Sequence, residues 1–458
     1  MKTDTIAAIA TGLSHAGISI IRISGEEAIK VANQLFVSKR EGFLLSDAKT
    51  HTIHYGYIKE KGEMIDEVLV SVMKGPNSYT GEDVVEINCH GGIVVTKRIL
   101  EAVLRAGAKA AEPGEYTKRA FLNGRIDLSQ AEAVIDIINA KNDMALKNSV
   151  RQLKGNVQEK IKKLRDTVLH DVAFIEAALD DPEHISLDGF TDTLHEHVTE
   201  QISEIEKLLK TTDNGRMIKE GIKTVILGKP NAGKSSLLNL LLGEERAIVT
   251  EIAGTTRDTL EEYVQLNGIT LHMIDTAGIR ETLDPVERIG VNRAKNIAQE
   301  ADFILFVTDS SVPLDENDIE ILQFIRGKKA LVLMNKSDLN PVLSEEEIKK
   351  YTDCTILKIS AKERIGLEEL EHTISSMFFS GELDFNDEVY ITNLRHKEAL
   401  QNAKDSLIKV QESIAAGMPE DFFSIDLMDS YERLGSILGE SVDEDLINTI
   451  FREFCMGK

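Results

Sequence analysis

The residues best suited to chemistry lie in a glycine-rich segment, GKPNAGKS at 228–235, which fits the pattern G-x-x-x-x-G-K-[ST] and directly follows a predicted strand. Its glycines let backbone N–H groups turn inward around phosphate oxygens. Lys234 would reach the β- and γ-phosphates, and the Ser235 hydroxyl would ligate magnesium. The segment therefore predicts a nucleoside triphosphate site. Its phosphate-binding residues would be Asn231, Ala232, Gly233, Lys234, Ser235 and Ser236.

Two later motifs, NKSD at 335–338 and SAK at 360–362, supply groups that distinguish guanine from adenine. NKSD at 335–338 offers the Asp338 carboxylate to the N1–H and the exocyclic amine of guanine, and adenine has no matching pair of donors. Asn335 would meet acceptors of the base, and the N–H of Ala361 would meet its O6. Both motifs follow predicted strands, and open α/β sheets bind ligands at the carboxyl ends of their strands. The predicted base-binding residues are Asn335, Lys336, Asp338, Ser360, Ala361 and Lys362.

Two segments between these motifs are suited to respond to the γ-phosphate, GTTRD at 254–258 and DTAG at 275–278. Asp275 would hold magnesium through water, and the N–H of Gly278 would contact the γ-phosphate. A threonine hydroxyl in such a segment completes the magnesium shell only while the γ-phosphate is present. We expect Ser235 and Thr256 to ligate magnesium. Further nucleotide contacts are expected from Thr250, Thr255, Thr256, Asp275, Thr276, Ala277 and Gly278.

The position after DTAG holds Ile279, where Ras-type enzymes carry a glutamine that orients water. Because an isoleucine cannot orient water, another group must do so. The nearby carboxylates belong to Glu281, Asp284 and Glu287, and by residue type each is more typical of a surface charge than of a catalyst. The candidates for an arginine finger are Arg257 and Arg280, with exposed loop residues as the alternative.

The composition of the chain limits its partners and its compartment. With 458 residues it exceeds what one hydrophobic core supports, so two or three domains are expected. A formal net charge of −24 disfavours general nucleic-acid binding, and any RNA contact is expected to be local or shared with a partner. Three scattered cysteines indicate a reducing compartment, and no apolar run is long enough to span a membrane. We therefore expect a cytoplasmic protein.

Hydrophobic patterns divide the chain into four parts. Residues 1–120 mix short β-rich runs with one helical stretch near 93–106, which is typical of an α+β domain. Residues 216–380 alternate strands and helices, and these strands are near-continuous apolar runs suited to a sheet covered on both faces. Residues 121–215 and 381–458 repeat apolar residues every three or four positions, as helices do.

The two helical parts are expected to form one domain, because each part alone is a thin bundle with an uncovered face. Two separate helical modules are the alternative. Ser129 and Glu132 have the spacing of a capping box at a helix start, and Asn214-Gly215 is a helix-stop signal. The predicted fold class is multi-domain, with an N-terminal α+β domain, an all-α helical domain and an inserted α/β P-loop (Ras-like) GTPase domain.

Blocks of sequence along the whole chain match those of one known family. They are IIRISG at 20–25, PNSYTGEDVVE at 76–86, EPGEYTKRAFLNGRIDL at 112–128, PNAGKSSLLN at 230–239, IAGTTRD at 252–258, DTAGIRE at 275–281, VERIG at 286–290 and the terminal FCMGK. On these blocks the chain resembles the MnmE (TrmE) family of tRNA-modification GTPases. The nucleotide motifs alone would also fit several ribosome-assembly GTPases. The N-terminal blocks and the Cys-x-Gly-Lys terminus are what single out this family.

The resemblance implies a homodimer formed through the N-terminal domain. That domain would hold a 5,10-methylene- or 5-formyl-tetrahydrofolate as a one-carbon donor. Carried over by motif, the residues lining the folate site would be Arg22, Glu86, Arg125 and Lys458. Arg125 stands where some members have lysine, which keeps the charge. Without the resemblance, Arg22 would be a strand-edge charge and Glu86 a solvated strand residue.

The resemblance also implies a partner, the FAD-dependent MnmG protein, in a heterotetramer. Together the two proteins would add an aminomethyl-type group, carboxymethylaminomethyl, to C5 of the wobble uridine of certain tRNAs. Cys455 matches the family's terminal cysteine, and both a part in this chemistry and a buried terminal thiol stay open for it. The alternative function is that of a ribosome-assembly or signalling GTPase with flanking binding modules.

The family pattern also fills the catalytic gap left by Ile279. Glu287, in VERIG, matches the carboxylate that activates water. A potassium ion would stand where other GTPases place an arginine finger, since potassium neutralises developing charge on phosphates as a guanidinium does. The resemblance thus implies potassium-dependent hydrolysis. The residues at the ion would be Asn231, Thr250, Ile252 and Thr255.

Overall fold

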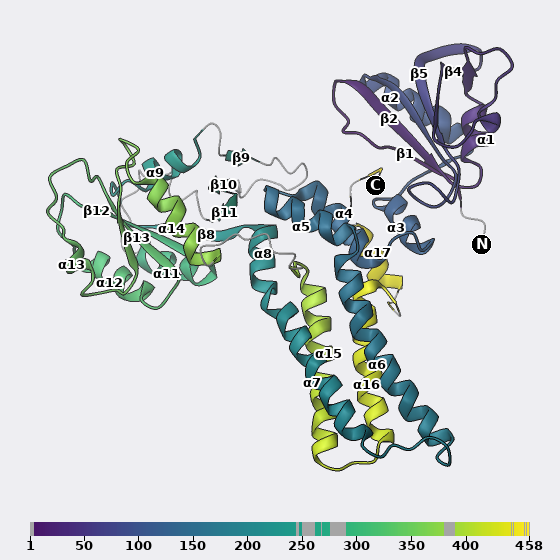
Figure 1. The fold of residues 1–458 in the computed structure, drawn as a ribbon. Coiled ribbons are helices and arrows are strands. Elements are labelled where there is room, and N and C mark those ends of the chain that lie inside the picture. Colours follow the sequence, from purple (N-terminus) through teal and green to yellow (C-terminus); the bar gives the residue numbers. More distant parts are fainter. Residues whose placement is uncertain are drawn as a thin grey trace. The chain divides into compact units, whose positions relative to one another are not determined.

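The computed structural model describes residues 4–243, 247–249, 262–266, 268–274, 290–379, 390–440, 442, 444–452, 454, 456 and 457. The chain forms two compact units. The first contains Met1–Ile135, Gln152–Leu194 and Lys409–Lys458, and the second contains Asp136–Arg151 and His195–Ile408. Each unit has its own seven-stranded β-sheet in the described part of the chain (Figure 1).

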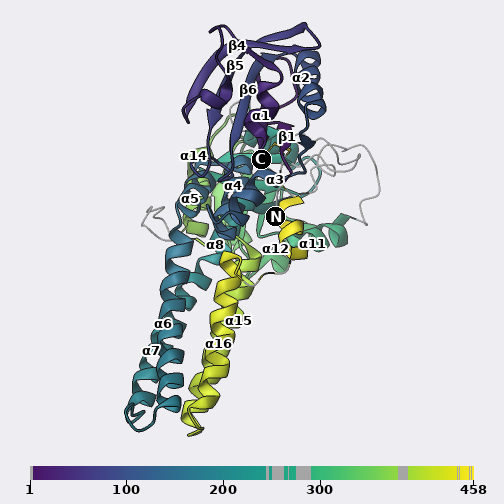
Figure 2. The same cartoon turned by 90° about the vertical axis from the view of Figure 1, so that its right-hand side faces the viewer.

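The sheet of the first unit has the strand order β3-β4-β5-β6-β2-β1-β7. Its strands are β1 (Ile6–Ile9), β2 (Ala16–Ser24), β3 (Phe36–Ser38), β4 (Thr52–Glu60), β5 (Glu63–Met73), β6 (Val84–Gly91) and β7 (Lys109–Ala110). Neighbours pair antiparallel, apart from the parallel pair of β1 and β7. Figure 2 shows β4, β5 and β6 side by side.

One face of this sheet is covered by helices α1 (Ala28–Asn33) and α2 (Ile93–Arg105), and the 3-10 helix η1 (Leu45–Asp47) adds to the same core. Alternate strand residues, such as Ile21, Val70 and Ile87, are fully buried against them. This alternation follows from the strand period of two, which sends successive side chains to opposite faces.

The opposite face of the sheet carries exposed apolar side chains and charged pairs. Tyr55 on β4 is paired with Leu69 on β5, and Ile53 lies two residues along the same strand. The side chains of Ile53, Tyr55 and Leu69 are 66%, 42% and 48% exposed. Arg22 and Glu86, which are paired across β2 and β6, lie on this face as well. The face therefore combines apolar surface with charged pairs.

The rest of the first unit brings the C-terminal segment back to the start of the helical part. The elements are α3 (Glu115–Leu122), the first part of α4 (Leu128–Asn139), α6 (Asn156–Asp180), α16 (Asp421–Leu438) and α17 (Glu444–Arg452). Leu128 and Val134 of α4 share a core with Phe451 and Phe454. Helices α6 and α16 lie side by side (Figure 1). The early and late helical parts therefore share apolar contacts.

The start of α4 differs from the predicted capping box. The Asp127 carboxylate accepts a hydrogen bond from the N–H of Gln130 at 2.8 Å, and the Gln130 side chain accepts one from the N–H of Asp127 at 3.0 Å. The reciprocal cap is therefore formed by Asp127 and Gln130, and the prediction of Ser129 and Glu132 is wrong. The reason is that a carboxylate caps a helix as well as a hydroxyl does, and Asp127 directly precedes the first residue of α4, whereas Ser129 already lies inside the helix.

The predicted helix stop at Asn214-Gly215 is also wrong. Helix α7 (Phe190–Lys210) is followed by α8 (Thr212–Glu220), so both residues lie inside a helix. A Cβ atom at Gly215 would collide with the backbone oxygen of Ile391. The glycine at this position thus allows a close backbone approach, which is a tertiary requirement and not a local one.

The sheet of the second unit has the strand order β14-β13-β12-β8-β11-β10-β9. Its strands are β8 (Ile222–Leu227), β9 (Ala247–Val249), β10 (Glu262–Leu266), β11 (Ile269–Met273), β12 (Phe303–Asp309), β13 (Ala330–Asn335) and β14 (Thr355–Lys358). The strands from β14 to β11 pair in parallel, whereas β10 pairs antiparallel with β11 and β9. Strands β10 and β11 form a hairpin in which Leu266 pairs with Ile269.

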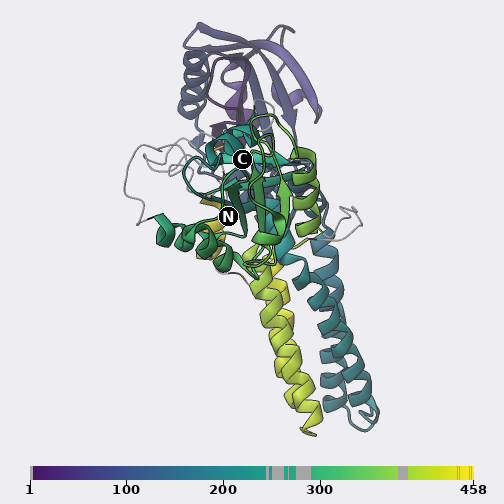
Figure 3. The same cartoon turned by 90° about the vertical axis from the view of Figure 1, so that its left-hand side faces the viewer.

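Helices cover both faces of this second sheet (Figures 1 and 3). They are α9 (Lys234–Leu241), α11 (Gly290–Glu300), α12 (Glu316–Ile325), α13 (Glu345–Ile348) and α14 (Leu367–Phe379). The two faces bury separate cores, one around Leu305 and Leu333 and the other around Phe306 and Val332. Near-continuous apolar strands are the expected sequence of a sheet buried on both faces.

The second unit also contains α8, most of α5 (Asp143–Leu153), most of α7 and the first part of α15 (Leu394–Ala415). These helices repeat apolar residues at helical spacing, and Leu400, Ala403 and Leu407 of α15 are buried. A search of the described residues for a helix of the length and apolarity that a bilayer requires found none.

Candidate functional site

The glycine-rich loop at 228–233 connects the end of β8 to the start of α9 and depends on two crowded glycines. Gly228 has φ +141°, and a Cβ atom there would collide with the backbone oxygen of Val307 on β12. Gly233 has φ +104°, and a Cβ atom there would collide with the Asn335 amide nitrogen. Both positions therefore need glycine for space and for backbone conformation. Asn231 also has a positive φ, of 64°.

Lys234 lies at the first position of α9 and turns toward this loop. Its Nζ donates hydrogen bonds to the backbone oxygens of Gly228 and Lys229, the latter at 2.8 Å. Burial lowers the pKa of Lys234. An anion beside this ammonium would favour its charged form, because opposite charges within hydrogen-bond reach stabilise ionisation. The position at a helix N-terminus adds the backbone N–H groups that bind phosphate.

Asn335, the last residue of β13, joins the glycine-rich loop to the loop at 360–362. Its Nδ2 donates to the backbone oxygen of Ala232 at 2.8 Å, and its Oδ1 accepts from the N–H of Ala361 at 3.0 Å. The Asn335 side chain is only 3% exposed. The sequence predicts that both Asn335 and the Ala361 N–H contact the base, whereas in this structure the two groups bond to each other.

The Asp338 carboxylate is well suited to accept hydrogen bonds from N–H groups. Its Oδ1 accepts a hydrogen bond from the Ser360 hydroxyl at 2.6 Å, and this bond lowers the pKa of Asp338. The carboxylate is therefore ionised at neutral pH and can accept two parallel hydrogen bonds, as guanine N1–H and its amine would require. Lys336 has φ +63°, and its ammonium lies 2.6 Å from the Asp309 carboxylate at the end of β12.

These loops enclose a cavity of about 500 Å³, which is in the range of small-molecule sites. Of the predicted nucleotide residues that the structure describes, Ala232 is buried beneath the loop and the others line the cavity. Leu339, which is 47% exposed, lines it too and was missed, since an apolar residue after NKSD carries no polar signal. The lining residues are Asn231, Gly233, Lys234, Ser235, Ser236, Asn335, Lys336, Asp338, Leu339, Ser360, Ala361 and Lys362.

Several sequence-predicted site residues lie outside the described residues, so the structure does not bear on them. For nucleotide and magnesium binding these are Thr250, Thr255, Thr256, Asp275, Thr276, Ala277 and Gly278. For catalysis and potassium binding they are Ile252, Arg257, Arg280, Glu281, Asp284 and Glu287. At the C-terminus they are Cys455 and Lys458.

The first unit brings together Arg22, Glu86 and Arg125, which are the predicted folate residues that the structure describes. Arg22 Nε donates to Glu86 Oε1 at 2.8 Å, and Arg22 Nη1 donates to the backbone oxygen of Gly457 at 3.0 Å. The guanidinium lies 5.8 Å from the centre of the Tyr79 ring, and the Arg125 guanidinium lies 4.9 Å from the same ring. The residue before Lys458 is thus in direct contact with Arg22.

Tyr116, which was not among the residues predicted from the sequence, supports this group through the backbone. Its hydroxyl donates to the backbone oxygen of Arg22 at 2.7 Å, and its ring is fully buried. Burial raises the pKa of Tyr116, so it stays a neutral donor. Gly457 fits against β1 closely enough that a Cβ atom there would collide with the backbone oxygen of Ile9. The C-terminal glycine is therefore needed for this approach.

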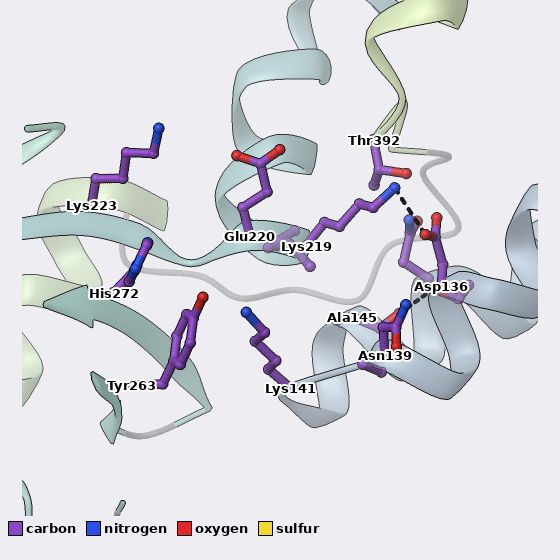
Figure 4. Close-up of a pocket in the computed structure, with 14 residues that line it drawn as sticks. Asp136, Asn139, Lys141, Ala145, Lys219, Glu220, Lys223, Tyr263, His272 and Thr392 are labelled. Atoms are coloured by element: carbon purple, nitrogen blue, oxygen red, sulfur yellow. Dashed lines mark hydrogen bonds and ion pairs between the residues drawn. The ribbon is translucent and has the colours of Figure 1, made fainter. Parts of the chain in front are cut away.

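A second cavity, of about 320 Å³, lies within the second unit between residues 136–149 and the strands β8, β10 and β11. Figure 4 shows Lys219 of α8 reaching toward Asp136, and their charged atoms are 2.8 Å apart. The Lys141 ammonium lies 3.5 Å from the centre of the Tyr263 ring, which stacks on His272 at 4.6 Å. Through the Lys219–Asp136 pair and the Lys141–Tyr263 contact, residues 136–149 are connected to α8 and β10.

Hydrogen bonds strengthen the same connection at residues 141 and 142. Asn142 Nδ2 donates to Thr270 Oγ1 at 2.8 Å and to the backbone oxygen of Ile218 at 3.2 Å. The Gln265 side chain donates to the backbone oxygen of Lys141. Residues 141 and 142, which connect α4 to α5, are thereby fastened to the β10–β11 hairpin.

A glycine-rich loop before a helix, with Asn335 and Asp338 at the carboxyl end of a parallel strand, defines the second sheet and its helices as a P-loop GTPase domain. Two family models match the chain: the N-terminus of the GTP-binding protein TrmE over residues 5–125 and the MnmE helical domain over residues 128–455. The chain belongs to the MnmE family of tRNA modification GTPases. It is a GTPase, and the predicted fold class is confirmed.

Curated relatives agree over the full length. The tRNA modification GTPase MnmE of Lachnoclostridium phytofermentans is 64% identical, with all of both chains covered. That of Thermoanaerobacter pseudethanolicus is 50% identical, again with all of both chains covered. Among solved structures, the G domain of the T. maritima FeoB iron transporter is 24% identical, covers 34% of this chain and 98% of its own, and has a TM-score of 0.26.

Proposed function

We propose that this GTPase works with an FAD-dependent MnmG partner to add a carboxymethylaminomethyl group to C5 of the wobble uridine of certain tRNAs. The observation that carries the proposal is the cluster of Arg22, Glu86, Arg125 and the C-terminal segment in a chain that is similar to tRNA modification GTPases over its full length. A GTPase whose flanking domains served only as binding modules would not need charged groups gathered in this way.

The residues of this cluster fit a reduced folate by their chemistry. The pterin of folate presents adjacent N–H groups, which a carboxylate such as Glu86 accepts, and the glutamyl tail carries carboxylates, which Arg125 and Lys458 can pair with. The Tyr79 ring, whose centre lies 5.8 Å from the Arg22 guanidinium and 4.9 Å from that of Arg125, offers a flat apolar surface. Bound here, a 5,10-methylene- or 5-formyl-tetrahydrofolate would supply the one-carbon unit of the modification.

The exposed face of the first sheet supports a homodimer formed through the N-terminal domain. Ile53, Tyr55 and Leu69 are all more than two-fifths exposed on that face, and apolar surface gathered on a sheet is typical of a protein interface. Arg22 and Glu86 share the face. A second copy of the chain covering it would also exclude water from the folate cluster.

In the nucleotide cavity, magnesium would be held by Ser235 and Thr256. Magnesium keeps several waters and takes only one or two protein ligands beside the phosphates, which suits a site built from two hydroxyls. It would neutralise charge on the β- and γ-phosphates. Ser235 lies in the first turn of α9 and lines the cavity.

Potassium would be held by Asn231, Thr250, Ile252 and Thr255 and would supply the positive charge that an arginine finger supplies elsewhere. Asn231 lines the cavity from the glycine-rich loop. Glu287 would act as the general base that activates the attacking water. Ordinary general bases contribute roughly a hundred- to ten-thousand-fold to a rate.

An acidic chain can still act on tRNA if its partner supplies most of the phosphate-binding surface, and this is how we account for the net charge of −24. The work would take place in the cytoplasm, where tRNA and GTP are present. Cys455 shortly precedes Gly457 in the sequence, and Gly457 contacts Arg22, so Cys455 is the residue of this chain that we assign to the modification chemistry.

The proposal is tested by mass spectrometry of wobble nucleosides in tRNA from a deletion strain that carries the parent gene, Arg22→Ala or Arg105→Ala. Arg105 is the matched control, since its 2.7 Å ion pair with Glu60 lies elsewhere on the N-terminal domain. The parent and Arg105→Ala should restore the modified uridine, and Arg22→Ala should not.

Two results separate the parts of the proposal. Failure of the parent gene to restore any C5-modified uridine would refute the function. Full restoration by Arg22→Ala would refute the folate site alone. Equilibrium dialysis of the purified full-length proteins against 5-formyl-tetrahydrofolate gives an independent measure, and binding should be lost in Arg22→Ala and kept in Arg105→Ala.

A further inference from the structure

The glycine-rich loop and the helix start that follows it contain two lysines, and these have different surroundings. Lys234 faces the backbone oxygens of the loop itself. The Lys229 ammonium instead forms two ion pairs, with Asp315 Oδ2 and with Asp318 Oδ2, each at 2.6 Å. Both carboxylates belong to the start of α12, which follows the strand β12 beside β8 in the sheet.

These two carboxylates form the N-terminal cap of α12. Asp315 Oδ1 accepts from the N–H of Asp318 at 3.0 Å, and Asp318 Oδ2 accepts from the N–H of Asp315 at 3.2 Å. Such a reciprocal box fixes the backbone of the first helical turn. Lys229 is therefore attached to a rigid part of the domain.

The ion pair is strongly held because one partner is buried. The Asp318 side chain is 4% exposed, whereas those of Lys229 and Asp315 are 26% and 50% exposed. Burial works against the charge on Lys229, but the hydrogen bonds to Asp315 and Asp318 outweigh it and raise the pKa of Lys229. A buried carboxylate left without a cation is costly, so Lys229 cannot leave this position freely.

The backbone of the same residue closes the loop. The oxygen of Lys229 accepts from the N–H of Ala232 at 3.3 Å and from Lys234 Nζ at 2.8 Å. On the other side, the oxygen of Ala232 accepts from Asn335 at 2.8 Å. The loop is thus held from one side by Asn335 and from the other by the side chain of Lys229.

We propose that Lys229 is a positioning residue for nucleotide binding: its ion pairs with Asp315 and Asp318 hold the glycine-rich loop against α12 in the shape that receives the phosphates. Lys229 acts through the loop backbone and does not touch the phosphates. This role separates it from Lys234, although both lysines belong to the same motif.

The test compares Lys229→Met, Asp318→Asn and the double variant in the full-length protein. GDP affinity is measured by fluorescence titration of a labelled GDP, and thermal unfolding is measured in parallel. Lys229→Met should raise the Kd for GDP about tenfold or more, the scale of one charge-assisted hydrogen bond. Lys229→Arg should recover most of the affinity. The matched control is Lys295→Met. Lys295 also forms a 2.6 Å ion pair with α12, through Glu320, but away from the glycine-rich loop. This variant should bind GDP as the parent does.

Asp318→Asn distinguishes positioning from direct phosphate contact. If Lys229 positions the loop, removing its buried partner should weaken GDP binding as Lys229→Met does, and the double variant should be little worse than either single one. If Lys229 bound phosphate directly, Asp318→Asn would remove one of the two carboxylates that hold its ammonium and leave the affinity unchanged or higher. That result, or an unchanged Kd in Lys229→Met, would overturn the proposal.

Where Lys229→Met does not fold, Asp315→Asn replaces it. Asparagine still caps the helix, and the more exposed Asp315 should give a smaller increase in Kd than Asp318. An equal or larger increase from Asp315→Asn would contradict the buried pair as the source of the effect.

Discussion

Replacing Asn335 by alanine should cost the second unit both stability and nucleotide affinity. The side chain is 3% exposed, and it makes two hydrogen bonds, to the oxygen of Ala232 at 2.8 Å and from the N–H of Ala361 at 3.0 Å. Ala232 and Ala361 are themselves 3% and 8% exposed, so water cannot easily replace the lost partner. An unsatisfied buried backbone group costs about 1–3 kcal/mol, and the two together about 2–6 kcal/mol.

The loss is measured by urea unfolding of the full-length variant, followed through the transition of the P-loop domain, and by titration with labelled GDP. Asn317→Ala is the control, because Asn317 lies exposed in the first turn of α12. A change of less than about 0.5 kcal/mol, the usual range of a surface substitution, together with unchanged GDP binding, would refute the assignment of Asn335 as the link between the two loops.

The remaining predictions concern the base, the catalyst, the cation and the C-terminus. Asp338→Asn should weaken GTP binding and favour xanthosine triphosphate, whose C2 carbonyl prefers a donor; equal GTP affinity would exclude Asp338 as the guanine acceptor. Glu287→Ala should keep GTP affinity and lose hydrolysis by roughly a hundred- to ten-thousand-fold in single turnover at saturating GTP, and an unchanged rate would exclude it as the base. Hydrolysis should be fast in potassium and slow in sodium at equal ionic strength, with Asn231→Ala slow in both; equal rates in the two salts would remove the cation. Deleting residues 455–458 should abolish tRNA modification and weaken folate binding in a reconstituted assay, and full modification by the truncated protein would contradict the C-terminal site.

Among the described residues that line the cavity, the sequence predicted which residues lie together better than it predicted how they bond. The motif spacing placed Asn335 and Asp338 at the end of a strand beside the glycine-rich loop, as the structure has them. It did not show that Asn335 spans two loops, since its partners lie 103 and 26 residues away. The partners of Lys229 were likewise not visible, because Asp315 and Asp318 belong to a helix cap in another part of the chain.

Local signals failed where a tertiary contact or an equally good neighbour decided the outcome. Gly215 matched a helix stop, yet it lies within α8. Glycine is needed there because the Ile391 backbone comes too close for a side chain. Ser129 matched a capping residue, yet Asp127 caps α4 first. Both errors arise because several residue types satisfy the same local rule, and only the packing of distant segments selects among them.

The electrostatics of the cavity favour one of its lysines as the phosphate-binding cation without reference to the motif. Three lysines line the cavity in the described part of the chain, and two of them, Lys336 and Lys362, lie 2.6 Å and 3.3 Å from the carboxylates of Asp309 and Glu363. The third, Lys234, is held by backbone oxygens, and its pKa is lowered by burial. An anion that binds beside Lys234 relieves the cost of its buried charge, whereas an anion at Lys336 must compete with a carboxylate. We therefore expect phosphate to bind beside Lys234 in an otherwise acidic protein.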